Sequence, residues 1–237
     1  MIELIKRISV FLFVIDIVAA ACLFKQSMEE MHVAAISANA SADSSKLHLQ
    51  TEQKPKIALT FDDGPDPVYT KQVLDVLKEK KVRATFFVMG KCIEGNEDLI
   101  KRMSAEGHLI GNHTFDHVNL TEFAEEEACE QLNKTASLIE ELTGQKVEFV
   151  RPPFGAWNDE AECVTDLIPV LWTIDTMDWC HQDIGKSLAK VEGKVSENDI
   201  ILMHDQYAET VEALGLIIDY LQRQGYELVT VDEIILD

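Results

Sequence analysis

Short apolar runs rich in β-branched residues alternate with amphipathic patterns along the chain from residue 56 onward. The apolar runs predict seven strands, over residues 57–61, 84–88, 108–112, 147–151, 169–175, 199–203 and 227–231. Between most of them, apolar residues recur at helical spacing and predict helices over 70–80, 97–106, 122–142 and 207–224. Strands that alternate with helices are typical of an α/β fold with a parallel sheet, and seven strands indicate a small barrel with imperfect closure.

The amino-terminal segment has the pattern of a targeting sequence. Lys6 and Arg7 precede a nearly continuous apolar run over 8–24, as in the charged and apolar regions of a signal peptide. The run is also just long enough to span a bilayer, so residues 1–26 are expected to be a signal peptide or a membrane anchor, with lipidation at Cys22 as a third route. Residues 27–54 carry no lasting periodicity and predict a flexible linker before a folded domain over 55–237. The protein is therefore expected to be secreted or anchored to the outer face of the cytoplasmic membrane, with membrane contact only through an uncleaved amino-terminal segment.

The charge of the chain excludes one class of partner. Its 42 acidic residues against 21 basic ones give a formal net charge of −21. A general nucleic-acid-binding protein needs a basic surface, so no nucleic acid is expected as a partner.

Four cysteines follow the targeting segment, at positions 92, 129, 163 and 180. An even count outside the cell permits two disulfides, but the spacings match neither a CxxC metal site nor a dense disulfide scaffold. Buried free thiols are therefore the favoured interpretation.

Polar side chains gather where the predicted strands end. Such residues follow or end the first, third, fourth, fifth and sixth strands: Asp62, Asp63, His113, His117, Arg151, Asp175, Asp178, His204 and Asp205. Because the carboxyl ends of parallel strands converge on one face of a barrel, these side chains are expected to meet in one site.

Two of these groups suggest metal and proton chemistry. His113 and His117 are spaced i, i+4, which would place both imidazoles on one side of a helical turn and let them share a metal. Asp62 and Asp63 leave a strand in different directions, so one can bind a metal while the other handles a proton. The alternative for the two histidines is that they are exposed polar residues of a loop. The alternative for the two aspartates is an ordinary turn, because Asp, Gly and Pro all favour turns.

The remaining groups suggest support for that chemistry. Arg151 can hold a carboxylate bidentately and keep it ionised, and Asp178 can orient a histidine such as His204. Each residue taken alone is also compatible with a purely structural ion pair or a structural histidine.

Five segments in order resemble the motifs of a known family. They are TFDDGPDPVYT at 60–70, NHTFDH at 112–117, RPPFG at 151–155, DTMDW at 175–179 and LMH at 202–204. They are similar to the five ordered motifs of the polysaccharide deacetylases related to the NodB chitooligosaccharide deacetylase, carbohydrate esterase family 4. The resemblance covers 55–237, which would make this range a polysaccharide deacetylase catalytic domain, and it implies the family's fold, an α/β distorted seven-stranded (β/α) barrel.

The resemblance also implies the metal ligands and the catalytic base. Asp63, His113 and His117 would bind a divalent metal, most often zinc, with Co²⁺ or Ni²⁺ as other candidates. Asp62 would be the general base and Arg151 its partner.

The other implied roles concern the leaving group and the substrate. His204 would be the general acid, oriented by Asp178. Four residues would contact the substrate: Pro153, Phe154, Trp179 and Leu202. Phe154 occupies a position that is often Tyr in the family, a change that loses a hydroxyl and spares the backbone N–H implied to bind the oxyanion.

The implied activity is metal-dependent removal of N-acetyl groups from a polysaccharide, with release of acetate. For an exported protein the nearest polymer is the cell wall, so N-acetylglucosamine of peptidoglycan is the expected substrate. Chitooligosaccharides, O-acetylated xylan and small amides remain alternatives, as does a carbohydrate-binding protein without activity. Two histidines and a carboxylate also form the iron site of Fe(II) oxygenases, which would require a double-stranded β-helix.

Overall fold

The computed structural model describes residues 54–157 and 166–236, which belong to one compact unit beginning at Lys54. The predicted targeting segment over 1–26 and nearly all of the predicted linker lie outside the described residues. Within the described ranges, no helix combines the length and the apolar character needed to cross a membrane.

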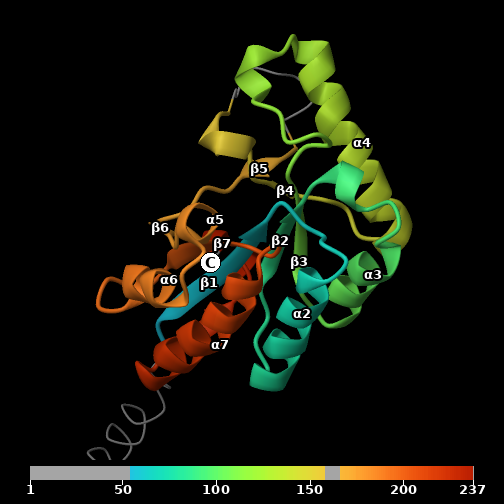
Figure 1. The fold of residues 1–237 in the computed structure, drawn as a ribbon. Helices are drawn as coiled ribbons and strands as arrows, with labels where there is room; N and C mark the ends of the chain where they lie inside the picture. The colour runs from blue at the N-terminus through green and yellow to red at the C-terminus, as the bar shows by residue number, and fades with distance from the viewer. Residues whose placement is uncertain (1–53, 158–165, 237) are drawn as a thin grey trace, which may run out of the picture. The chain divides into compact units, whose positions relative to one another are not determined.

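The centre of the fold is a curled, wholly parallel sheet (Figure 1). Its strands are β1 (Lys56–Asp62), β2 (Thr85–Val88), β3 (Leu109–Asn112), β4 (Phe149–Val150), β5 (Ile168–Pro169), β6 (Ile174–Asp175), β7 (Asp199–His204) and β8 (Glu227–Val229). The order is β5-β4-β3-β2-β1-β7-β6, and β8 pairs with β1. An all-parallel sheet is not a double-stranded β-helix, which removes the fold basis for an Fe(II) oxygenase.

The strand predicted over 169–175 is wrong as a single strand. Its first part, β5, pairs with β4, and its second part, β6, pairs with β7 at the opposite edge of the sheet. Residues 170–173 connect the two edges and so close the curled sheet. Counting β5 and β6 as halves of one kinked strand leaves seven strand positions, and the predicted distorted seven-stranded barrel is confirmed.

Helices surround the sheet. The longer ones are α2 (Tyr69–Lys80), α3 (Glu97–Ala105), α4 (Glu125–Thr143), α6 (Ile184–Val191) and α7 (Ala208–Arg223). In the order α6, α7, α2, α3 and α4, each packs against the next around the outside of the sheet (Figure 1). The shorter ones are α5 (Asp178–His181), α8 (Asp232–Ile235) and the 3₁₀ turns η1 (Gly90–Cys92), η2 (Leu120–Glu122) and η3 (Pro153–Gly155). The helix predicted from residue 122 begins at Glu125, after η2, and α5, α6 and α8 were not predicted.

Alternation along β1 connects the core to the candidate site. Ile57, Leu59 and Phe61 point outward into the main apolar cluster, which includes Leu74 of α2 and Leu214 of α7. The intervening residues point inward. Ala58 packs in a smaller apolar cluster inside the barrel, and Thr60 and Asp62 follow it on the same face, both buried. The inward-facing residues of β1 therefore change from apolar to polar toward the carboxyl end of the strand.

Candidate active site

Arg151 lies inside the barrel and is fully buried. Nη1 donates to Asp62 Oδ1 at 2.9 Å and to Thr60 Oγ1 at 2.6 Å. Nε and Nη2 donate to the carbonyl oxygens of Val170 and Leu171, at 3.0 and 3.1 Å. Burial lowers the pKa of Arg151 while Asp62 raises it, and guanidinium remains charged under all ordinary conditions. The expected bidentate hydrogen bonding to a carboxylate is therefore wrong. Only Nη1 donates to Asp62, because Nε and Nη2 donate to backbone carbonyls between β5 and β6.

Three predicted metal ligands meet at the mouth of the barrel. Nε2 of His113 and Nε2 of His117 each lie 3.3 Å from Asp63 Oδ1. Their potential ligand atoms all lie within 4.8 Å of one another, so the group could hold a metal ion. Asp63 Oδ1 is buried and has no hydrogen-bond partner, which is costly for a carboxylate oxygen unless a cation is nearby.

Neighbouring groups prepare these ligands for a cation. The His113 Nδ1 donates to the carbonyl oxygen of Arg151 at 2.6 Å, and this tautomer leaves a lone pair on Nε2. Burial lowers the pKa of His117, which favours the neutral form that binds metals. Burial raises the pKa of Asp63, but the close approach of His113, with the influence of His204 and His117, outweighs it and holds that pKa below its ordinary value.

The segment that carries the two histidines is a loop, not the predicted helical turn. Thr114 and His117 both have left-handed backbone conformations, with φ of 63° and 62°. The Thr114 hydroxyl accepts from the backbone N–H groups of His117 and Val118, and Asn112 Oδ1 accepts from the Thr114 N–H. These side-chain bonds replace helical ones. The rings still come together, with centroids 5.0 Å apart.

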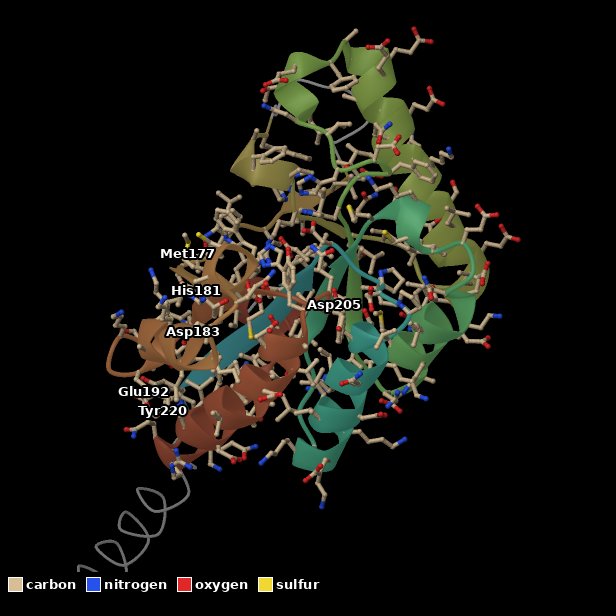
Figure 2. All side chains as sticks on the ribbon, in the orientation of Figure 1. Met177, His181, Asp183, Glu192, Asp205 and Tyr220 are labelled. Atoms are coloured by element: carbon tan, nitrogen blue, oxygen red, sulfur yellow. The ribbon has the colours of Figure 1, made fainter. Side chains whose placement is uncertain are left out.

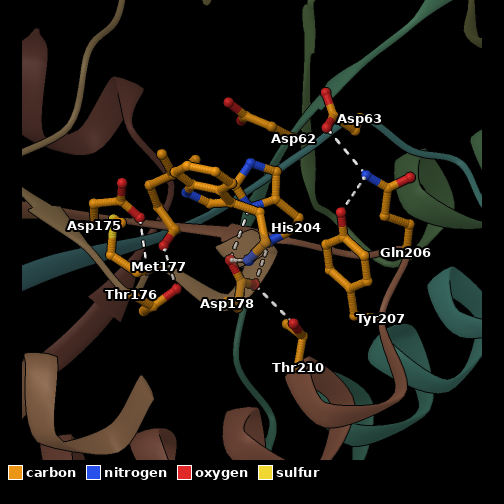
Figure 3. Close-up of polar contacts among 12 residues, drawn as sticks. Asp62, Asp63, Asp175, Thr176, Met177, Asp178, His204, Gln206, Tyr207 and Thr210 are labelled. Atoms are coloured by element: carbon orange, nitrogen blue, oxygen red, sulfur yellow. Dashed lines mark hydrogen bonds and ion pairs between the residues drawn. The ribbon is translucent and has the colours of Figure 1, made fainter. Parts of the chain in front are cut away.

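His204 and Asp178 form a second buried pair (Figure 3). His204 Nδ1 lies 2.8 Å from Asp178 Oδ1, and Asp178 Oδ2 accepts from the His204 N–H and from the Thr210 hydroxyl. Burial alone would lower the pKa of His204, but its hydrogen bond to Asp178 and the charges of Asp178, Asp62 and Asp63 raise it to about 9. Burial likewise opposes ionisation of Asp178, yet the bonds from His204 and Thr210 keep its pKa below the ordinary value.

A cavity of about 490 Å³ opens above these groups. Its lining includes the three potential metal ligands, the predicted base and acid, and three predicted substrate-binding residues: Asp62, Asp63, His113, His117, His204, Phe154, Trp179 and Leu202. Arg151 and Asp178 lie behind the wall and reach the cavity only through Asp62 and His204. The fourth predicted substrate-binding residue, Pro153, is buried in η3, and its neighbour Pro152 lines the cavity instead.

Two aromatic residues also line the cavity although the sequence predicts no role for them: Trp172 and Tyr207. Trp172 lies within the predicted fifth strand and Tyr207 at the start of a predicted helix. Phe154, which was predicted, packs its ring edge-on against His117, with centroids 4.9 Å apart, although 71% of its surface is exposed. Its φ of 60° is a left-handed conformation that bulky residues rarely adopt. Strain of this kind is typical of functional loops.

Asp205 lies inside the molecule (Figure 2), and its carboxylate packs against Gly64 in the turn that carries Asp63. Its Oδ2 accepts from the Thr70 hydroxyl at 2.5 Å, and burial raises its pKa to about 7. A Cβ added to Gly64 would lie 2.4 Å from both carboxylate oxygens of Asp205. Of the two polar residues that end the sixth predicted strand, His204 therefore faces the cavity and Asp205 packs against the turn behind it.

The expectation of buried free thiols is wrong for the described cysteines: two are free but not buried, and one is disulfide-bonded. Cys92 and Cys180 are free, the first half-buried and the second exposed. Cys129 on α4 is disulfide-bonded. Cys163 lies outside the described residues.

Comparisons with known proteins agree with this geometry. The family model described as polysaccharide deacetylase matches residues 49–168. The chain is 40% identical to the peptidoglycan-N-acetylglucosamine deacetylase PgdA of Listeria monocytogenes over 76% of this chain, although it spans only 38% of that protein. It is 36% identical to a peptidoglycan-N-acetylglucosamine deacetylase of Bacillus cereus, over 76% of this chain and 87% of that one. The structure of the peptidoglycan deacetylase PdaC from Bacillus subtilis superposes with a TM-score of 0.74 at 39% identity, covering 77% of this chain and 90% of that one.

Proposed function

Because the chain belongs to the polysaccharide deacetylase family, we propose that it is a metal-dependent hydrolase that removes N-acetyl groups from peptidoglycan N-acetylglucosamine and releases acetate. One observation carries the proposal. Asp63 Oδ1, buried and without a hydrogen-bond partner, lies 3.3 Å from a ring nitrogen of each of two histidines, in a cavity shared with Asp62 and His204.

Asp63, His113 and His117 fit a divalent cation. Ligand atoms about 2.0–2.1 Å from a tetrahedral zinc lie roughly 3.4 Å from one another, and the two N–O separations at this site are 3.3 Å. Zinc is therefore the proposed metal, and Co²⁺ or Ni²⁺ would suit the same donors. When bound, the cation polarises the acetyl carbonyl and lowers the pKa of a water molecule toward about 7.

Asp62 is the proposed general base. Its Oδ1 is held by Arg151, while Oδ2 lies 3.9 Å from Nε2 of His113, on the side of the metal ligands. The charged hydrogen bond from the guanidinium holds the carboxylate in place and prevents it from turning. Oδ2 is thus free to take a proton from a water molecule that attacks the acetyl carbon.

His204 is the proposed general acid. Its Nδ1 is engaged by Asp178, so Nε2 is the nitrogen available to the cavity that His204 lines. With a pKa raised to about 9, the ring carries a proton at neutral pH. It can donate that proton to the sugar nitrogen as the C–N bond breaks, which avoids expulsion of an amide anion.

The cavity walls supply a place for the acetyl group. Leu202 and Trp179 are the proposed contacts of the acetyl methyl, and the backbone N–H of Phe154 is the proposed donor to the oxyanion. A single donor of this kind typically contributes about 3 kcal/mol to the stability of a transition state. The Phe side chain lacks a hydroxyl, but the backbone donor does not depend on it.

The substrate is inferred from export and from relatives. We propose that the amino-terminal segment directs the protein to the cell surface, where peptidoglycan is the nearest acetylated polymer. The relatives are named for N-acetylglucosamine and, in PdaC, for N-acetylmuramic acid of peptidoglycan. The filled base, acid and ligand positions argue against a carbohydrate-binding protein without activity.

The test is acetate release by the full chain loaded with zinc, measured in parallel on peptidoglycan, chitooligosaccharides and acetylxylan. We expect release from peptidoglycan, and release slower by about 10²- to 10⁴-fold when Asp62→Asn replaces the natural protein. Release from chitooligosaccharides or acetylxylan alone would reassign the substrate. No release from any polymer, with one zinc bound per chain, would contradict the proposal and favour a small-amide hydrolase or a binding protein.

A further inference from the structure

The two carboxylate oxygens of Asp63 have different surroundings. Oδ1 faces the two histidines, as described above. Oδ2 accepts a hydrogen bond from Nε2 of Gln206 at 3.1 Å. The carboxylate is therefore held with one oxygen toward the potential cation and the other toward a neutral amide.

Gln206 is itself fixed by its neighbour (Figure 3). Its Nε2 also donates to the hydroxyl oxygen of Tyr207 at 3.3 Å. An amide nitrogen has two protons, and here one points to Asp63 and the other to Tyr207. The opposite amide orientation would bring Oε1 against the carboxylate of Asp63, which is repulsive. Gln206 and Tyr207 are both half-buried, so water competes only in part for their hydrogen bonds.

The connection between β7 and α7 supplies this amide. It leaves β7 at His204 and enters α7 at Ala208, so that the proposed acid and Gln206 lie on opposite sides of buried Asp205 in the chain. The same short segment thus reaches the leaving-group side of the cavity and the metal side. None of the five family-like motifs includes residue 206.

We infer that Gln206 is a positioning residue, which holds Asp63 as a ligand through one oxygen and keeps Oδ1 directed at the cation. The inference rests on the proposed metal site. Its physical basis is that a carboxylate without a partner on Oδ2 can turn about its last bond, so that Oδ1 is aimed at the metal only part of the time. Because Gln206 carries no positive charge, it orients Asp63 without competing with the cation for the carboxylate.

The test is zinc affinity of the full chain, measured by competition with a chromophoric chelator. Gln206→Met removes the amide and keeps the length of the side chain. We expect it to weaken zinc binding by about 10- to 100-fold, the range typical for loss of a group that orients a metal ligand. Tyr207→Phe, which removes only the hydroxyl that holds the amide, should weaken binding in the same direction by a smaller factor.

The control is Gln72→Met, the same change on the exposed surface of α2. It should bind zinc like the natural protein. The unfolding midpoint of metal-free Gln206→Met should match that of metal-free Gln72→Met. The visible spectrum of the Co²⁺-loaded protein should change in Gln206→Met alone, because Asp63 can then offer its second oxygen.

Equal zinc affinities for Gln206→Met and the natural protein would overturn the inference. If Gln206→Met does not fold, Tyr207→Phe decides the question in the same assay, and an unchanged affinity there counts against a positioning role. Failure of the natural protein to bind zinc is a separate result, which would overturn the proposed metal site itself.

Discussion

The backbone carbonyl of Arg151 lies 2.6 Å from Nδ1 of His113, while the Arg151 side chain donates to Asp62. One residue therefore sets the tautomer of a potential metal ligand with its backbone and holds the proposed base with its side chain. The two functions are separable, because a substitution at residue 151 removes the side chain and leaves the carbonyl.

Arg151→Met is expected to destabilise the protein while leaving the carbonyl that accepts from His113. The guanidinium is fully buried, and its loss leaves the Asp62 carboxylate and the Val170 and Leu171 carbonyls without a donor. Removing one member of a buried ion pair typically costs about 3–5 kcal/mol. Urea unfolding of the metal-free protein measures this loss, and zinc content of the folded protein should stay near one ion per chain. A variant as stable as the natural protein would contradict the structural account of Arg151.

Asp62→Asn should separate metal binding from turnover. The amide cannot accept the proton of water, so the acetate release rate should fall by about 10²- to 10⁴-fold, the usual contribution of a general base. Zinc content should be unchanged, because Asp62 is not among the three proposed ligands. His113→Ala should lose both zinc and activity. Full activity in Asp62→Asn would exclude the base assignment.

The alkaline limb of the pH profile should report on His204. With a pKa of about 9, the ring is protonated at neutral pH, and kcat/KM should fall as pH rises through about 9. Asp178→Asn removes the group that holds the proton, so the limb should move to lower pH. The same raised pKa stabilises the fold fully below the ordinary value of 6.5, and this contribution is lost as pH rises through about 9. A profile with the same alkaline limb in both proteins would mean that His204 is not the acid.

His108 should make stability depend on pH at the acidic end. Its Nδ1 accepts from the Ala84 N–H, and burial lowers its pKa from 6.5 to about 4. The neutral ring is favoured in the fold, so its contribution is complete above pH 6.5 and is lost as pH falls through about 4, with a size of about 3 kcal/mol.

His108→Asn keeps an acceptor near Ala84 and cannot titrate. The difference in free energy of unfolding between His108→Asn and the natural protein should therefore change between pH 6.5 and about 4 and be flat above that range. Carboxylates elsewhere cancel in this difference. Parallel stability curves throughout would rule out the buried, neutral state of His108.

Gly64→Ala should disturb the turn that carries Asp63. The new methyl group would lie 2.4 Å from both carboxylate oxygens of Asp205, a contact that forces a shift and typically costs about 1–3 kcal/mol. Gly215→Ala is the matched control, because Gly215 lies within α7 with open space around its Cβ direction, and alanine there should stabilise by about 0.5–1 kcal/mol. Chemical unfolding of both variants checks the opposite signs. Equal effects would mean that Asp205 yields to the methyl without cost.

The fold class and the charged residues at the centre of the site follow from the sequence alone. Period-2 and period-3.6 patterns depend on local geometry, and they located most strands and four of the five longer helices within a few residues. The strand pattern is also sufficient to bring Asp63, His113 and His117 together, because parallel strands place their carboxyl ends on one face.

The contacts made by individual polar side chains follow only from the tertiary structure. The kink between β5 and β6 lies where the Arg151 side chain donates hydrogen bonds to the carbonyl oxygens of Val170 and Leu171, about twenty residues away. The loop at 113–117 is shaped by Thr114 bonds that override helical spacing. Gln206 reaches Asp63 across 143 positions of sequence. The bonds of Arg151 and Gln206 carry no periodicity along the chain, since they form only after packing has brought donor and acceptor together.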